Sequence, residues 1–256
     1  MARTVDINCD LGESFGAYTI GDDTGMMAVI TSASIACGFH GGDPLVMERT
    51  IHLALERGVA VGAHPGFPDL AGFGRREMRL SPDELRAGLI YQIGALSALA
   101  QTQGAVLQHV KPHGALYNMA ASDEVLACTI AGAVTAVDPR LILVVLDGSV
   151  MERAARDAGL RVAREAFGDR AYQRNGTLAG RSRPGALVID PDTVARRVVR
   201  MVTEGVIDAL GGGEVRVSPH TICFHGDTPG GPRLAGAARD GLTRAGVEIA
   251  PMGQWL

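Results

Sequence analysis

The chain alternates between short apolar runs and stretches in which apolar residues recur with helical spacing. Runs of β-branched and aliphatic residues predict strands, and the amphipathic stretches between them predict helices. Because parallel neighbours need a crossover of helical length, this alternation predicts a parallel sheet. The predicted strands cover residues 4–10, 34–37, 59–63, 105–110, 141–146, 160–164 and 221–224, with a short strand at 247–249 and an ambiguous apolar run at 186–189.

Capping residues mark the starts of the predicted helices. Asp43 before a proline, a capping box over residues 81–84 and Asp190 before a proline are each typical of a helix N-terminus. The predicted helices cover about residues 44–58, 82–104, 122–138 and 190–205, and a further helix begins after residue 231.

The length of 256 residues and this order of elements fit one closed α/β structure, a (β/α) barrel. We expect a single domain over residues 1–256, since no linker or repeat interrupts the pattern. Residues 167–184 are rich in Gly and Arg and lack clear periodicity, which predicts a long loop over a site.

Composition narrows the class of protein. Hydrophobic residues make up 46% of the chain and charged residues 20%, which excludes a disordered chain. A net charge of −4 argues against a nucleic-acid partner, and no apolar run approaches the roughly 18 residues that cross a bilayer. The first residues lack a signal-peptide core and the four cysteines form no C-x-x-C motif, so we expect a reduced, cytoplasmic protein.

Polar residues gather where the predicted strands end, which is where β/α barrels carry their active sites. Strand alternation places Asp6, Asn8 and Asp10 on one face, and we expect that face to point into the barrel. The residues expected to meet in one site are Asn8, Asp10 and Glu13 after the first strand, His40 and Asp43 after the second, His64 after the third, Lys111 and His113 after the fourth, and His225 and Asp227 near the end of the chain.

Lys111 is the only lysine among 24 basic residues. Arginine therefore serves wherever a general surface cation suffices. A compact ammonium whose pKa responds to its surroundings has different uses from a guanidinium, so Lys111 is predicted to have a specific chemical role.

Two other kinds of chemistry stay open at this stage. Asp10, His40 and His64 follow three successive strands and form a plausible facial set for Zn²⁺ or Mn²⁺, although no compact metal motif such as H-E-x-x-H is present. Cys37 and Cys223 are possible nucleophiles, but neither has a paired base in the sequence.

Anion binding has several candidate residues. The chain has no G-x-x-x-x-G-K-[ST] motif, so a P-loop is excluded. A nucleotide can still bind at a helix N-terminus, such as the one predicted after residue 231. Arg75, Arg76 and the arginines of residues 170–183, beginning with Arg170, are candidates to hold anionic groups.

Several long motifs resemble one known family. The sequences of residues 6–16 (DINCDLGESFG), 35–44 (IACGFHGGDP), 62–69 (GAHPGFPD) and 109–118 (HVKPHGALYN) look like the LamB/YcsF family of lactam-utilisation proteins, which includes the A subunits of 5-oxoprolinases. Residues 165–172 (EAFGDRAY) and 221–228 (TICFHGDT) match its later blocks. The resemblance covers essentially the whole chain, with small departures at Gly41 and Gly168, where alanine is more usual.

The resemblance implies both a fold and an activity. The fold is an irregular seven-stranded barrel similar to glycoside hydrolase/deacetylase barrels. The activity is hydrolysis of a cyclic amide C–N bond, in which 5-oxo-L-proline (pyroglutamate) is opened to L-glutamate while ATP is cleaved to ADP and phosphate. The family implies ATP as co-substrate and the 5-oxoprolinase subunits B and C as partners, and it adds Asn118 and Asp169 to the candidate binding residues.

A mechanism can be written for the candidate residues as a hypothesis. Asp10 or Glu13 orients or deprotonates water, Lys111 neutralises charge on oxygen or phosphate, and His64 or His113 protonates the ring nitrogen. The candidates for binding substrate or nucleotide are Asn8, His40, Asp43, Arg75, Asn118, Asp169, Arg170, His225 and Asp227. Two alternatives remain: a metal-assisted amidohydrolase or deacetylase acting alone, and a non-catalytic subunit that holds substrate.

Overall fold

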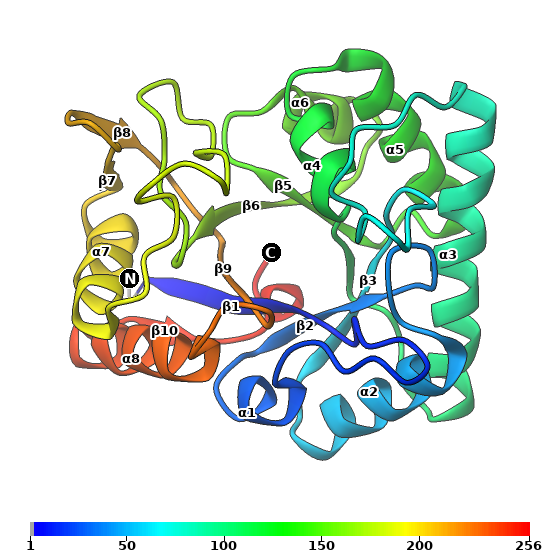
Figure 1. The fold of residues 1–256 in the computed structure, drawn as a ribbon, viewed down its shortest axis with the longest axis horizontal. Coiled ribbons are helices and arrows are strands. Elements are labelled where there is room, and N and C mark those ends of the chain that lie inside the picture. Colours follow the sequence, from blue (N-terminus) through cyan, green and yellow to red (C-terminus); the bar gives the residue numbers. More distant parts are fainter. Residues whose placement is uncertain (1–2) are drawn as a thin grey trace.

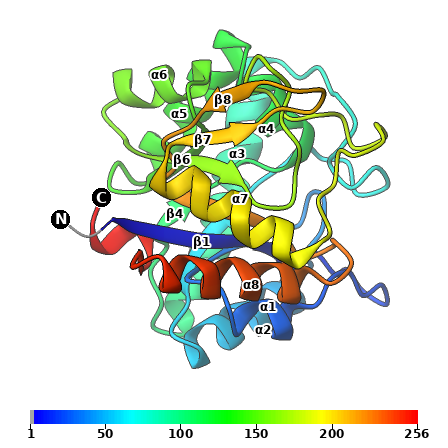
Figure 2. The ribbon, with the colours of Figure 1, turned by 90° about the vertical axis from the view of Figure 1, so that its left-hand side faces the viewer.

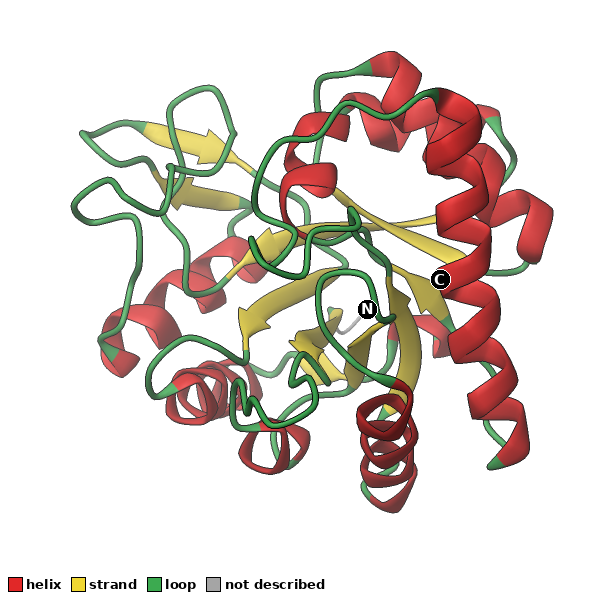
Figure 3. Ribbon diagram, turned by 45° about the vertical axis from the view of Figure 1, so that its right-hand side comes forward, coloured by secondary structure: helices red, strands yellow, loops and turns green. Residues whose placement is uncertain are grey.

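Parallel strands close into a ring in the computed structural model, which describes residues 3–256 (Figures 1 and 3). The first two residues of the segment considered for a signal peptide lie outside that range. The ring order is β1-β2-β3-β4-β5-β6-β9, and β1 also pairs with β9 and closes it, which confirms the predicted seven-stranded barrel. Its strands are β1 (Thr4–Leu11), β2 (Ser32–Ala36), β3 (Ala60–His64), β4 (His109–Val110), β5 (Ile142–Leu146), β6 (Arg161–Phe167) and β9 (Thr221–His225), while β10 (Glu248–Ile249) adds to β1 outside the ring.

Helices surround the ring (Figure 3), and α7 packs beside α8 along one side of it (Figure 2). The predicted caps are confirmed: Asp43 accepts hydrogen bonds from the backbone at the start of α2, and Ser81 and Glu84 form the capping box of α3. The helices are α1 (Asp23–Met27), α2 (Pro44–Glu56), α3 (Pro82–Thr102), α4 (Gly114–Ala120), α5 (Glu124–Val137), α6 (Val150–Asp157), α7 (Pro191–Thr203), α8 (Gly231–Arg244) and the 3₁₀ helix η1 (Met252–Gln254).

The structure differs from the predicted elements in several places. The short helices α1, α4 and α6 and the antiparallel hairpin of β7 (Val206–Asp208) and β8 (Glu214–Arg216) were not predicted. The predicted strand 105–110 shrinks to β4, because Ala105 still donates its N–H to the end of α3. Residues 186–189 join no named strand of the described chain. Their backbone pairs instead with Asp169 and Ala171 and holds the loop after β6.

The barrel interior is polar, as the alternation along β1 predicts. Val5, Ile7 and Cys9 are fully buried in the apolar core, whereas Asp6 accepts hydrogen bonds from hydroxyl groups of β2 and β9. Asn8 donates to the carboxylate of Glu165 on β6, which is separated from β1 only by β9. These bonds satisfy polar groups that would be costly to bury unpaired.

His109 shows how closely this interior is packed. Its ring is fully buried against Ser34, with 3.1 Å between Nε2 and the Ser34 Oγ. A Cβ atom at Gly62 would overlap with the same ring, so only glycine fits opposite it. Burial and then the charge of Lys111 lower the pKa of His109 to about 3, so the ring is neutral and structural.

We expect Asp6→Asn to remove one loss of stability that the wild type undergoes as pH rises from about 4 to 6. Burial raises the pKa of Asp6 to about 6, so the stability it contributes is complete below its unfolded pKa and is lost as pH rises through about 6. The shift from 3.8 to about 6 corresponds to at most about 3 kcal/mol in the free energy of unfolding. Urea unfolding across this range measures it.

The control for this prediction is Asp157→Asn, at an exposed site on α6. Burial also raises the pKa of Asp23 to about 6, so this residue still makes stability depend on pH in the Asp6→Asn variant. An Asp6→Asn profile parallel to that of the wild type would contradict the prediction.

Among residues 3–256, no single helix is long and apolar enough to cross a membrane. Helices α4 and α5 together reach the length and apolar composition of a membrane-spanning segment, but the two helices are bent by 115° relative to one another.

Candidate active site at the carboxyl ends of the strands

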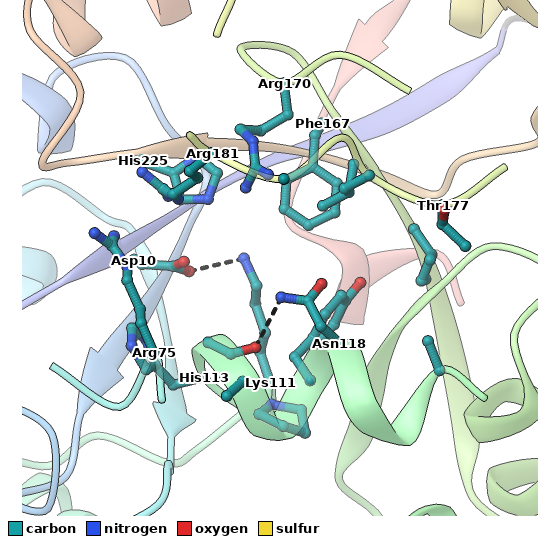
Figure 4. A pocket seen from close by; sticks show the side chains of 18 of the residues that line it. Asp10, Arg75, Lys111, His113, Asn118, Phe167, Arg170, Thr177, Arg181 and His225 are labelled. Carbon is teal, nitrogen blue, oxygen red and sulfur yellow. Dashed lines mark hydrogen bonds and ion pairs between the residues drawn. The ribbon is translucent and has the colours of Figure 1, made fainter. Parts of the chain in front are cut away.

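A cavity of about 530 Å³ opens at the carboxyl ends of the barrel strands (Figure 4). The loop predicted to cover a site does so, since residues 177–182 form part of the wall. The predicted site residues that line the cavity are Asp10, Glu13, His64, Arg75, Lys111, His113, Asn118, Arg170 and His225.

Lys111 is the centre of a buried polar network. Its Nζ lies 2.7 Å from Oδ1 of Asp10, 2.9 Å from Oε1 of Glu165 and 3.1 Å from Oδ1 of Asn8. Figure 4 shows the carboxylate of Asp10 and the ammonium pointing toward one another. Residues from three strand regions therefore aim their groups at one point, and the ammonium has two carboxylates within hydrogen-bond distance.

Neighbouring charges determine the protonation states of Asp10 and Lys111. Burial alone would raise the pKa of Asp10, but the charges of His64 and Lys111 outweigh it and hold that pKa well below its usual range. Burial likewise opposes the charge of Lys111, and the carboxylate of Asp10 overrides it and raises the lysine pKa. At neutral pH the pair is thus an ammonium and a carboxylate.

The two cysteines considered as nucleophiles are poor ones. Cys223 lies 3.0 Å from Nζ of Lys111, and burial nevertheless raises its pKa well above the usual value. Burial raises the pKa of Cys37 to about 12. Both side chains are therefore protonated thiols at neutral pH, and only a thiolate attacks efficiently.

Three histidines from different strand ends meet beside this network. His64 Nδ1 lies 2.7 Å from the backbone carbonyl of Lys111, and His113 Nε2 lies 2.8 Å from the carbonyl of Phe73. A carbonyl can only accept, so each of these nitrogens carries a hydrogen. The remaining nitrogens, Nε2 of His64 and Nδ1 of His113, face one another at 2.9 Å.

Glu13 and His40 complete the histidine cluster. The ring of His40 stacks on that of His113 with centroids 3.6 Å apart, and Oε1 of Glu13 lies 3.3 Å from a nitrogen of each ring. Within the described chain, neither nitrogen of His40 nor Oε1 of Glu13 has a hydrogen-bond partner. Burial and then the charge of Asp10 raise the pKa of Glu13, and burial lowers the pKa of His40 and His113.

The backbone that holds this cluster is strained. Phe73, whose carbonyl accepts from His113, has a φ of 56°, in the left-handed region that favours glycine. Such strain persists only where the surroundings impose it and is common at functional sites.

Asp169 and His225 form a second pair, in which His225 lies beside Asp10. His225 Nδ1 lies 2.9 Å from the Asp169 carboxylate, which also accepts from the His225 backbone and from Thr228. Burial would raise the pKa of Asp169, but the charge of His225 and these bonds lower it. Asp169 therefore fixes the ring orientation and leaves Nε2 of His225 free of this bond.

Arginines surround the mouth of the cavity. Arg75 and Arg181 both face Asp227, at 2.6 and 3.8 Å, so Asp227 lies at the rim and does not line the cavity. Arg170 donates to the carbonyl of Ala179 within the covering loop. Burial, and then the nearby charge of Arg181, lower the pKa of Arg170 to about 10. These cations suit an anionic group on a bound molecule.

The remaining predicted residues have supporting positions. Asn8 lies beneath Lys111, Asp169 lies behind His225, and Asp43 is the N-cap of α2, where it also accepts from the Gly16 backbone. Asn118 lines the cavity but donates to the carbonyl of Gly114 in its own helix.

Arg76, one of the candidates to hold an anionic group, lies away from the cavity. Its guanidinium pairs with the buried carboxylate of Asp69, and it does not line the cavity wall. That carboxylate also accepts a hydrogen bond from the backbone of Gly72, so the pair holds the loop after β3 in place.

Glu165 was missed by sequence reasoning. The predicted strand stopped at residue 164, whereas β6 continues to Phe167 and carries the carboxylate to within 2.9 Å of Lys111. A signal was present, since this acidic residue begins the EAFGDRAY motif and is followed directly by apolar residues.

Two groups of side chains have the composition of metal-ligand sets. Glu13, His40, His64 and His113 form one group, and Asp10, Cys223 and His225 form the other. In each group, one ligand atom per residue lies within 4.8 Å of the others. Of the predicted facial set, His40 and His64 fall in the first group. Asp10 instead bonds Lys111, with its Oδ2 3.4 Å from His64.

Comparisons with known proteins identify the family and agree with this fold. The sequence profile of the LamB/YcsF family matches residues 5–256. The chain is 56% identical to the 5-oxoprolinase A subunit of Heliobacterium modesticaldum over 96% of both chains, and 57% identical to that of Thermus thermophilus over 96% of this chain and 98% of the relative. The crystal structure of a lactam utilization protein from Thermus thermophilus superposes with a TM-score of 0.92 at 55% identity, covering 96% of this chain and 99% of the other.

Proposed function

The chain belongs to the LamB/YcsF family, and from this premise we propose that it is the A subunit of a 5-oxoprolinase, which opens the lactam of 5-oxo-L-proline to L-glutamate. The observation that supports this most is the meeting of Lys111, Asp10 and His225 around one cavity whose mouth is lined with arginines. A small, carboxylate-bearing lactam fits a site with cations at its rim and acid–base groups at its base.

The chemistry of the lactam calls for activation. An unstrained amide is a poor electrophile and its nitrogen a poor leaving group. Transfer of the γ-phosphoryl group of ATP to the lactam oxygen gives ADP and an activated carbon. Water then adds to that carbon, and the C–N bond breaks as the nitrogen takes a proton. A second water hydrolyses the resulting acyl phosphate to glutamate and phosphate. We propose ATP as co-substrate on this ground, with subunits B and C as partners.

The residues divide these tasks by position. Lys111 neutralises charge on the lactam oxygen, because its ammonium is held by two carboxylates and lines the cavity. Asp10, ionised beside it, orients the attacking water. His225, oriented by Asp169, protonates the departing nitrogen. This last assignment favours His225 over His113, whose pKa burial holds well below its usual value.

The test is release of glutamate from 5-oxoproline, measured with this chain alone and with its partner subunits, each with and without ATP. We expect turnover only when the subunits and ATP are present together, with one ADP formed per glutamate. The absence of glutamate under every condition would contradict the proposal.

A second function is favoured by the cluster of Glu13 with three histidines, which resembles a catalytic metal site. It is metal-assisted hydrolysis of an amide by this chain alone. Glutamate release without ATP or partners would support this alternative over the first.

A further inference from the structure

We propose that Glu13, His40, His64 and His113 bind one Zn²⁺ ion at the base of the cavity. The four side chains come from the ends of β1 to β4 and the loops that follow them, and each is at least nine-tenths buried. Three imidazoles with one carboxylate are a ligand set that zinc prefers. The contacts that hold Lys111 in place do not involve His40 or His113, so the presence of this cluster needs a separate explanation.

The spacing of the ligand atoms suits a common ion. Zinc ligands about 2.0–2.2 Å from the metal lie about 3.4 Å from one another in a tetrahedral site. The corresponding contacts here are 3.3 Å from Glu13 to His40, 3.3 Å from Glu13 to His113 and 2.9 Å from His64 to His113.

Unpaired polar atoms point into this space. His40 is fully buried, yet within residues 3–256 neither of its nitrogens has a hydrogen-bond partner, and Oε1 of Glu13 is also unpaired. Buried polar groups without partners are costly, and a cation between them would supply the missing interactions. The facing nitrogens of His64 and His113 lie 2.9 Å apart, and a cation could take the place of the single hydrogen that they can share.

The hydrogen bonds on the far side of the His64 and His113 rings are of the kind that metal-ligating histidines make. Such residues usually donate their second N–H to a backbone carbonyl or carboxylate, which fixes the tautomer and ring orientation. His64 does so to Lys111 and His113 to Phe73. Gly74 leaves room for both side chains, because a Cβ there would lie 2.7 Å from the ring of His113 and 2.8 Å from Cβ of His40.

The position also gives the ion access to substrate. Glu13, His64 and His113 line the cavity, whereas His40 closes the site from behind. An ion with these four ligands would be tetrahedral, and it could polarise a bound carbonyl by accepting that oxygen as a fifth ligand. That role rests on the proposed function, but binding of the ion does not.

The experiment measures binding of Zn²⁺ to the full chain after chelation and removal of the chelator. We expect one equivalent of Zn²⁺ per chain, by calorimetry and by elemental analysis, and a higher Tm in its presence. Glu13→Gln should weaken binding at least about 100-fold. His52→Gln, on the exposed face of α2, and Cys223→Ser, in the second group, should leave it unchanged.

Crystals of the wild-type chain soaked in Zn²⁺ provide a measurement that does not depend on variant folding. We expect one anomalous peak between the four side chains. Binding of less than a tenth of an equivalent, a peak elsewhere, or loss of binding in Cys223→Ser with retention in Glu13→Gln would overturn the proposal. Because no turnover is measured, these outcomes are independent of lactam hydrolysis.

Discussion

The Lys111→Arg variant is expected to lose at least about 1,000-fold in kcat for 5-oxoproline while it remains folded. Three oxygens of Asp10, Glu165 and Asn8 surround Nζ at 2.7–3.1 Å and fix a point charge there. A guanidinium is planar and larger, so it cannot place one nitrogen at that position with the same three partners. The adjoining cavity accommodates the longer side chain while its charge stays beside the two carboxylates, so the fold survives. Turnover in the assembled enzyme and circular dichroism measure the two effects.

The matched control is Arg86→Lys, the reverse exchange at an exposed position on α3, which should leave kcat unchanged. Lys111→Met keeps the aliphatic stem and removes the charge, and it leaves two carboxylates without their cation. We expect this variant to lose both turnover and stability. Turnover of Lys111→Arg close to that of the wild type would remove Lys111 from the mechanism.

The barrel was predictable because its strands and helices are separated by strong local signals. The aspartate before a proline at the start of α2 and the capping box of α3 act within one turn of helix, so sequence alone locates them. The hairpin of β7 and β8 could not be predicted from the sequence. Its strands are three residues each and partly exposed, and they have no alternating apolar pattern.

The sequence predicted which residues meet in the site better than it predicted which of them contact one another. Strand ends of a barrel converge, so Asp10, Lys111 and His225 were expected to meet, and they do. The partner of Lys111 on β6 was missed because one residue at a strand boundary decides whether Glu165 points inward. The contact between His113 and Phe73 depends on a strained loop conformation, which no local pattern encodes.

Asp10→Asn is expected to lower kcat about 100- to 10,000-fold with a small change in KM. The carboxylate is the cavity-lining acid that contacts both Lys111 and His64, at 2.7 and 3.4 Å. An asparagine side chain keeps one oxygen for the ammonium but places an N–H₂ group, which donates and cannot accept, where water is to be oriented. Glu165→Gln should have a smaller effect, because Glu165 does not line the cavity and acts through Lys111. Asp240→Asn, exposed on α8, is the control. Steady-state kinetics of the three variants in the assembled enzyme measure how far each one lowers kcat. If Glu165→Gln lowers kcat as much as Asp10→Asn or more, then Asp10 acts by holding Lys111 and does not orient the water.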